Sequence, residues 1–307
     1  MKKILSGLIN LGILLIIIGL VINYKEEILN VYKVYILSAN DKLSINNNKY
    51  HREYNFNYIK NTSNYSPKNK KEIRDIYYTL INSGQRDFTF FCPTSYKECI
   101  SVVDEVGNDS TMLSHINNFT HPYNGFKHIE TKYDNLGRVT IHIDKSYTEE
   151  QINEVNKKID EVLNRIDKNL SIKEQIKQIH DYIINSTKYD KERSEKNIVK
   201  YSSDIAYGPL VEGYALCGGY TDAMELFLER LNIKSYKVSS ENHVWNAVNL
   251  DGNWYNLDLT WDDPVASDDR NILDYSFFLI DTEKLHSIEK NEHNFDINVY
   301  SELKGND

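Results

Sequence analysis

The sequence predicts an α+β fold in which amphipathic helices alternate with short antiparallel strands. In residues 171–186, isoleucines recur at positions 172, 176, 179 and 183, a spacing that places them on one face of a helix. Farther along, two alternating runs meet at Asp251-Gly252, the dipeptide that two-residue type I′ hairpin turns favour. The chain has 307 residues, 40% apolar and 26% charged, so it can form one large globular domain or two ordinary ones.

The N-terminal stretch predicts a transmembrane anchor over residues 1–23. Lys2 and Lys3 precede residues 4–22, which are almost entirely apolar and would rise roughly 28 Å as a helix, close to the thickness of a bilayer's hydrocarbon layer. A cleaved signal peptide is the alternative, but the small-residue cleavage motif is missing. The two lysines favour a cytoplasmic start. We therefore expect a single-pass protein of the cell membrane whose C-terminal part is extracellular.

Composition and periodicity divide the rest of the chain into three parts. Residues 24–70 are polar, which predicts a stalk or linker with one short helix at most. Residues 71–168 predict a small α+β domain, and residues 169–307 a second unit that carries the hairpin. We expect the small domain to contain helices at 71–80, 96–106 and 149–166 and strands at 88–91, 126–131 and 139–143. Its histidines lack cysteine or acidic neighbours at ligand spacing, so we expect neither a metal nor a cofactor.

The cysteines and the net charge limit the environment and the partners. Cys92 and Cys99 could pair in an oxidising exterior or remain two unpaired thiols in a small core, and either arrangement leaves Cys217 free. The net charge is −9, which argues against nucleic acid as the main partner, because phosphate binding needs a basic face.

Cys217 has the surroundings that a cysteine nucleophile needs. It stands in front of a helical pattern that ends near Leu231, and the positive end of a helix dipole favours a thiolate. Gly218 and Gly219 follow it; their missing side chains are expected to leave room for an acyl group, and their amides to face an oxyanion. Gly218 is therefore a candidate substrate-binding residue, as is Trp245 on the hairpin. A small buried structural cysteine is the alternative.

The hairpin turn brings His243 close to Asp258. If Leu250 pairs with Asn253, the imidazole and the carboxylate lie on one face of the hairpin as diagonal neighbours, within reach of a hydrogen bond. The carboxylate would then orient the imidazole and leave its other ring nitrogen for the thiol. A register slip of one residue would place the two side chains on opposite faces, so the prediction depends on the position of the turn.

Three stretches together resemble the bacterial transglutaminase-like (transglutaminase/protease-like) superfamily. They are residues 213–220 (GYALCGGY), 243–246 (HVWN) and 253–264 (NWYNLDLTWDDP). The similarity extends from about Ser171 to Asp281. It implies a papain-like core in which the cysteine opens a helix that packs on an antiparallel sheet carrying the histidine and the aspartate.

By this resemblance, Cys217 is the nucleophile, His243 the base and Asp258 its orienting partner. The superfamily includes crosslinking transferases, peptidases, amidases and inactive members, so the resemblance implies acyl transfer on peptide or glutamine amides through a thioester, without deciding whether water or an amine resolves it. The expected partner is a protein or peptide substrate, and the cell wall is a further candidate. One alternative is an inactive scaffold that binds cell-wall or division proteins. Another is a wall-binding adaptor whose N-terminal domain carries the function; residues 71–168 resemble a domain beside such cores in anchored Gram-positive proteins.

Overall fold

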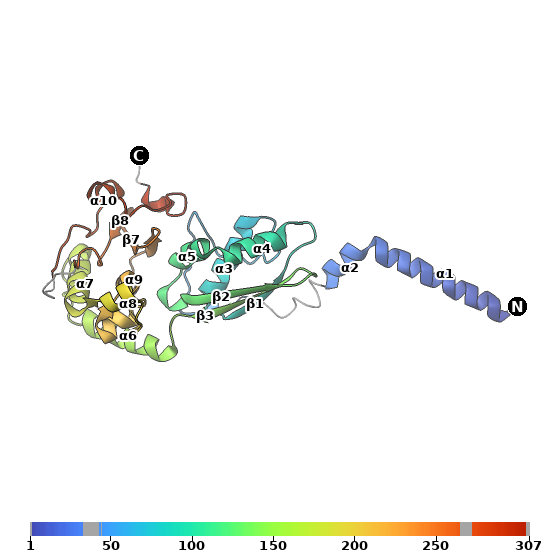
Figure 1. Ribbon diagram of the computed structural model, residues 1–307, viewed down its shortest axis with the longest axis horizontal. Coiled ribbons are helices and arrows are strands. Elements are labelled where there is room, and N and C mark those ends of the chain that lie inside the picture. Colours follow the sequence, from blue (N-terminus) through green and yellow to red (C-terminus); the bar gives the residue numbers. More distant parts are fainter. Residues whose placement is uncertain (1, 33–42, 44, 265–271, 305–307) are drawn as a thin grey trace.

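The computed structural model describes residues 2–32, 43, 45–264 and 272–304, which form a mixed α+β structure with two three-stranded antiparallel sheets (Figure 1). Its α-helices are α1 (Lys2–Asn23), α2 (Lys25–Val31), α3 (Lys70–Ser83), α4 (Cys99–Asn108), α5 (Ser110–Asn118), α6 (Glu149–Leu163), α7 (Ile172–Ser186), α8 (Lys191–Lys196), α9 (Cys217–Arg230) and α10 (Thr282–Ile288). Its strands are β1 (Asp87–Phe91), β2 (Phe126–Tyr133), β3 (Arg138–Lys145), β4 (Lys188–Tyr189), β5 (Tyr214–Ala215), β6 (Ser235–Ser239), β7 (Val244–Leu250) and β8 (Asn253–Leu257).

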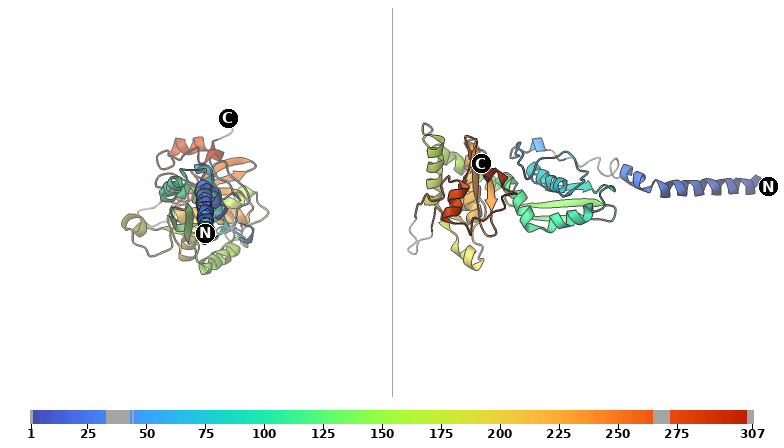
Figure 2. Two further views of the ribbon diagram at one scale, coloured as in Figure 1. Left: turned by 90° about the vertical axis from the view of Figure 1, so that its right-hand side faces the viewer. Right: turned by 90° about the horizontal axis from the view of Figure 1, so that it is seen from above.

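The N-terminal helices α1 and α2 extend away from the rest of the molecule (Figures 1 and 2). Within the described ranges of the chain, no helix combines the length and the apolar character that crossing a bilayer requires. The transmembrane anchor predicted over residues 1–23 is therefore wrong, and so is the single-pass placement at the cell membrane that followed from it.

The first half of the body contains a sheet in the order β1-β3-β2, with α3, α4 and α5 along it (Figure 1). Alternate residues of β3, Val139, Ile141 and Ile143, are at most 1% exposed and face the core, as the period of a half-buried strand requires. A disulfide between Cys92 and Cys99, with Cα atoms 5.7 Å apart, ties the end of β1 to the start of α4. Of the two arrangements left open by the sequence, the paired one is observed.

The second half contains a sheet in the order β6-β7-β8, on which α9 packs, and α7 packs in turn on α9. The helices α6 and α7 begin where the sequence predicts, because Thr148 and Ser171 each form a complete capping box with the residue three positions on. Helices α5, α8 and α10 and strands β4, β5 and β6 were not predicted from the sequence. The hairpin β7–β8 positions the histidine and the aspartate opposite the first turn of α9.

The two halves pack against each other. Phe119, just after α5, lies 5.0 Å from the ring of Tyr236 on β6, and both belong to one core cluster. From the segment predicted to be a stalk, Ile59 is fully buried and Arg52 forms a buried ion pair with Glu225 of α9. Part of residues 24–70 is thus packed into the body. The domain boundaries themselves stay predictions.

Candidate active site

The structure places Cys217 at the first position of α9, with its side chain partly exposed. The preceding residue, Leu216, has an extended backbone and offers no capping side chain to the first amides of the helix. These amides have no acceptor within the helix either, because the first turn of any helix lacks one. The start of α9 therefore combines a thiol with backbone donors and the positive end of a helix dipole.

The glycines after the cysteine serve a different purpose from the one the sequence suggested. A Cβ atom on Gly218 would lie 2.7 Å from the carbonyl oxygen of Asp204, and one on Gly219 would lie closer still to that of Ser203. The amide of Leu216 also donates to the Ser203 carbonyl at 2.8 Å. The missing side chains therefore admit the backbone of residues 203–204 against α9, rather than an acyl group.

The hairpin has the predicted register. Leu250 pairs with Asn253, and the two turn residues between them have φ values of 52° and 87°, as a type I′ turn requires. As a result, His243 Nε2 lies 2.6 Å from Asp258 Oδ2, with both side chains buried. The predicted contact between imidazole and carboxylate is confirmed, and it leaves His243 Nδ1 for the thiol.

Asp258 is held from several sides. Its Oδ1 accepts the backbone amides of Thr260 at 2.9 Å and Trp261 at 3.3 Å. Its Oδ2 is shared between His243 and a second imidazole, that of His293, whose Nε2 lies 2.9 Å away. A carboxylate with this many donors stays ionised and fixed in orientation.

The electrostatics favour a charged histidine. Burial would lower the pKa of His243, but the Asp258 carboxylate, its hydrogen bond and the neighbouring Cys217 outweigh burial and raise the pKa to about 10. Burial would likewise raise the pKa of Asp258, yet His243 and His293 hold that pKa well below its usual value. A protonated imidazole beside a sulfur is the arrangement that stabilises a thiolate, the reactive form of cysteine.

His293 is a site residue that was not predicted from the sequence. It is fully buried, stacks on Phe277 with ring centroids 5.2 Å apart, and meets the indole rings of Trp245 and Trp261 edge-on. It follows α10 in a segment with no repeating pattern, beyond the stretch that resembles the superfamily. No signal in the sequence singled it out.

Among the residues that the structure describes, His243, Asp258 and His293 form the one group of three whose potential metal-ligand atoms lie within 4.8 Å of one another. The hydrogen bonds of 2.6 and 2.9 Å account for this proximity. A metal would need the lone pairs of both imidazoles, whereas here each ring nitrogen points its proton at the carboxylate.

The loop that carries Asp258 is anchored at two further aspartates. Asp262 Oδ2 lies 3.2 Å from Nε2 of the fully buried His180 on α7. Asp263 accepts a 2.5 Å hydrogen bond from the hydroxyl of Tyr220, one turn into α9. Burial raises the pKa of Asp263 to about 6, with Tyr220 and His180 acting in the opposite direction. These bonds fix the aspartate loop to α7 and to α9, the helix that carries the thiol.

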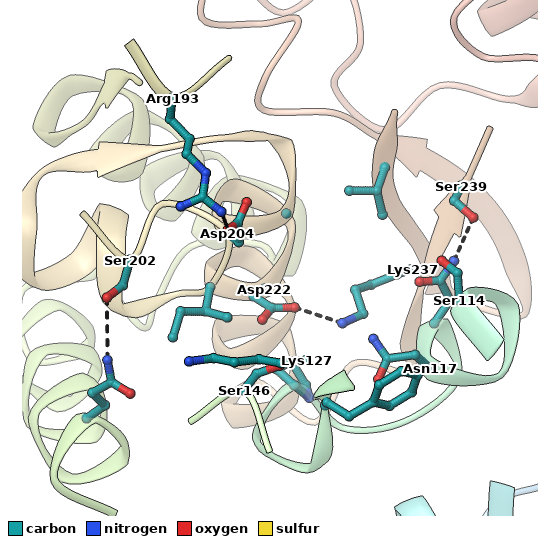
Figure 3. A pocket seen from close by; sticks show the side chains of 18 of the residues that line it. Ser114, Asn117, Lys127, Ser146, Arg193, Ser202, Asp204, Asp222, Lys237 and Ser239 are labelled. Carbon is teal, nitrogen blue, oxygen red and sulfur yellow. Dashed lines mark hydrogen bonds and ion pairs between the residues drawn. The ribbon is translucent and has the colours of Figure 1, made fainter. Parts of the chain in front are cut away.

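A pocket of about 700 Å³ opens beside the site (Figure 3). Gly218 and Val244, the residues after the cysteine and the histidine, form part of its wall, and a role of Gly218 in substrate binding stays a prediction. Trp245 does not line the pocket. It is fully buried, and its indole N–H donates to Asn256 Oδ1 at 2.9 Å. The expectation that Trp245 lines a substrate groove is therefore wrong, because its ring belongs to the core.

No family model and no curated protein matches the chain. Similar solved structures include a transglutaminase, at 17% identity and a TM-score of 0.32, covering 44% of this chain and 44% of that one. A candidate cysteine protease from Cytophaga hutchinsonii is 13% identical with a TM-score of 0.27, covering 43% of this chain and 61% of that one. The chain thus spans less than two thirds of either protein. Similarity at this level does not assign an activity to this chain. The function is therefore inferred from the geometry of the site.

Proposed function

We propose that the protein is a cysteine-dependent acyl-transfer enzyme with a transglutaminase-like core, acting on peptide or glutamine amides. The observation that carries the proposal is the 2.6 Å contact between His243 and Asp258, which keeps the imidazole charged beside Cys217. A structural histidine in a strand needs no such partner, and a structural cysteine needs no imidazolium.

The reaction follows from these three side chains. The Cys217 thiolate attacks the amide carbonyl carbon, forming a carbon–sulfur bond while the carbonyl oxygen takes up the electron pair and faces the amides at the start of α9. When the carbon–nitrogen bond breaks, the imidazolium of His243 gives its proton to the leaving amine and becomes neutral. Water or a second amine then attacks the thioester, the imidazole takes a proton from it, and the thiolate is released. Asp258 keeps the ring in one orientation throughout.

Trapping the thioester tests this proposal. The protein is incubated with benzyloxycarbonyl-Gln-Gly, quenched in acid and analysed by intact and peptide mass spectrometry. We expect one acyl adduct on Cys217, lost on addition of hydroxylamine, and no adduct in Cys217→Ala or His243→Ala. Circular dichroism establishes that both variants are folded.

Because other peptide amides could be the preferred donor, the same experiment is repeated with a tryptic digest of total bacterial protein. A wild-type protein that forms no adduct with either donor, and whose Cys217 reacts with iodoacetamide no faster than glutathione at pH 6, refutes the proposal. That result would favour the alternative of an inactive scaffold.

A further inference from the structure

The pocket beside the candidate site is built from both halves of the molecule. Gly218, Lys237 and Val244 come from the second half, while Asn117 and Lys127 come from the first half. Figure 3 labels Asn117, Lys127 and Lys237. Its volume of about 700 Å³ is within the usual range for a ligand site. Two of its lining residues, Gly218 and Val244, directly follow the cysteine and the histidine in sequence, so the pocket lies next to the candidate site.

The charges that line this pocket do not cancel. Three cations and two carboxylates line it, and both carboxylates already have partners: Lys237 lies 2.8 Å from Asp222, and Arg193 lies 2.5 Å from Asp204. Asp222 also accepts the hydroxyl of Tyr147 at 2.7 Å, so both of its oxygens are engaged. Lys127 is thus the surplus cation.

Lys127 is exposed, and no ion pair to it occurs within the described part of the chain. Figure 3 shows its side chain among those that line the pocket, as are the side chains of the Asp222–Lys237 pair. The pocket is therefore locally positive in a chain whose net charge is −9. Around this cation, amide and hydroxyl groups such as those of Asn117, Ser146 and Ser202 offer hydrogen bonds to a peptide backbone.

We propose that this pocket binds the acyl donor as an acidic peptide, with Lys127 selecting a carboxylate side chain near the amide that reacts. The proposal builds on the proposed function, and it assigns a role to the first half of the molecule, which supplies one wall of the pocket. The net negative charge of the whole chain repels anions at long range, so the selection of an acidic peptide would depend on its local contact with Lys127.

Protection of Cys217 from alkylation tests the proposal without requiring turnover. Iodoacetamide labelling at pH 6 is timed in the presence of acetyl-Ala-Asp-Ala-amide or its isosteric neutral counterpart acetyl-Ala-Asn-Ala-amide. We expect the acidic peptide to protect at about three- to fivefold lower concentration, the effect of one partly exposed ion pair, and the difference to shrink as salt is added. Lys127→Gln should abolish the difference and Lys127→Arg should keep it.

Lys97→Gln is the matched control, because it removes the same charge from an exposed position beside the start of α4. It should leave the ratio unchanged. Equal protection by the two peptides, no protection by either, or a ratio that Lys127→Gln leaves unaltered overturns the inference. If the sulfur itself reacts no faster than a free thiol at pH 6, the proposed function fails instead, so the two failures can be told apart.

Discussion

Replacing Asp258 with asparagine should uncouple the thiol from its histidine. The substitution keeps the shape of the side chain but removes the negative charge that lies 2.6 Å from His243 Nε2. Burial then acts on the imidazole with little opposition, and we expect the pKa of His243 to fall from about 10 to below its ordinary value of 6.5. At neutral pH the sulfur would then face an uncharged imidazole.

The size of the effect follows from the ionised fraction of a thiol. A cysteine of ordinary pKa is about 0.3% thiolate at pH 6, so complete ionisation increases the reactive form roughly 300-fold. A more acidic thiolate is a weaker nucleophile, which removes about a factor of ten. We therefore expect Asp258→Asn to slow iodoacetamide labelling of Cys217 at pH 6 on the order of 30-fold.

The assay is a stopped alkylation series from pH 5 to 9, followed by mass spectrometry of the peptide that contains Cys217. At pH 6 the wild type should react faster than Asp258→Asn, and the difference should narrow as the pH approaches 9. His293→Gln keeps the carboxylate and loses one of its donors, so its rate should lie between the two. If Asp258→Asn is folded and still reacts at pH 6 within threefold of the wild type, the reasoning is refuted.

Three further predictions concern stability. Gly219→Ala should destabilise the fold by about 1–3 kcal/mol in urea unfolding, because the new methyl group would strike the carbonyl of Ser203; an unchanged midpoint would contradict this. Arg52→Ala should cost about 3–5 kcal/mol, because it leaves Glu225 buried without its cation, and restoring much of that loss with the additional change Glu225→Gln would identify the pair as the cause. The raised pKa of His243 stabilises the fold fully below pH 6.5, and this stabilisation is lost as the pH rises to about 10, so the wild type should lose up to about 5 kcal/mol over that range, and His243→Gln should lack this loss.

The hairpin was predictable because its determinants are local. The turn dipeptide sets the register, and the period of two along a strand then decides which side chains share a face. The start of α9 was likewise readable from the pattern around Cys217, and the capping boxes marked the starts of α6 and α7. In each case a few neighbouring residues determine the geometry.

The rest of the site depends on contacts between distant segments. His293 reaches Asp258 because an irregular segment packs against three aromatic rings. Such packing leaves no periodic pattern in the sequence from which it could be predicted. The role of Gly219 was misjudged because the group that needs its missing side chain is a backbone carbonyl, which any residue at position 203 would supply. Arg52, in a polar stretch, gives no sign that a buried carboxylate lies 173 residues away.

The carboxylate of Asp258 receives two imidazoles on one oxygen and two backbone amides on the other. All of its lone pairs are thereby occupied, so it has no room to accept a mobile hydrogen ion. Proton transfer is therefore limited to the sulfur of Cys217, the Nδ1 atom of His243 and the substrate, water or amine bound beside them. Asp258 therefore orients His243 without accepting a proton itself. We expect solvent isotope effects on each chemical step to report the transfer of one proton, between His243 and the reacting groups.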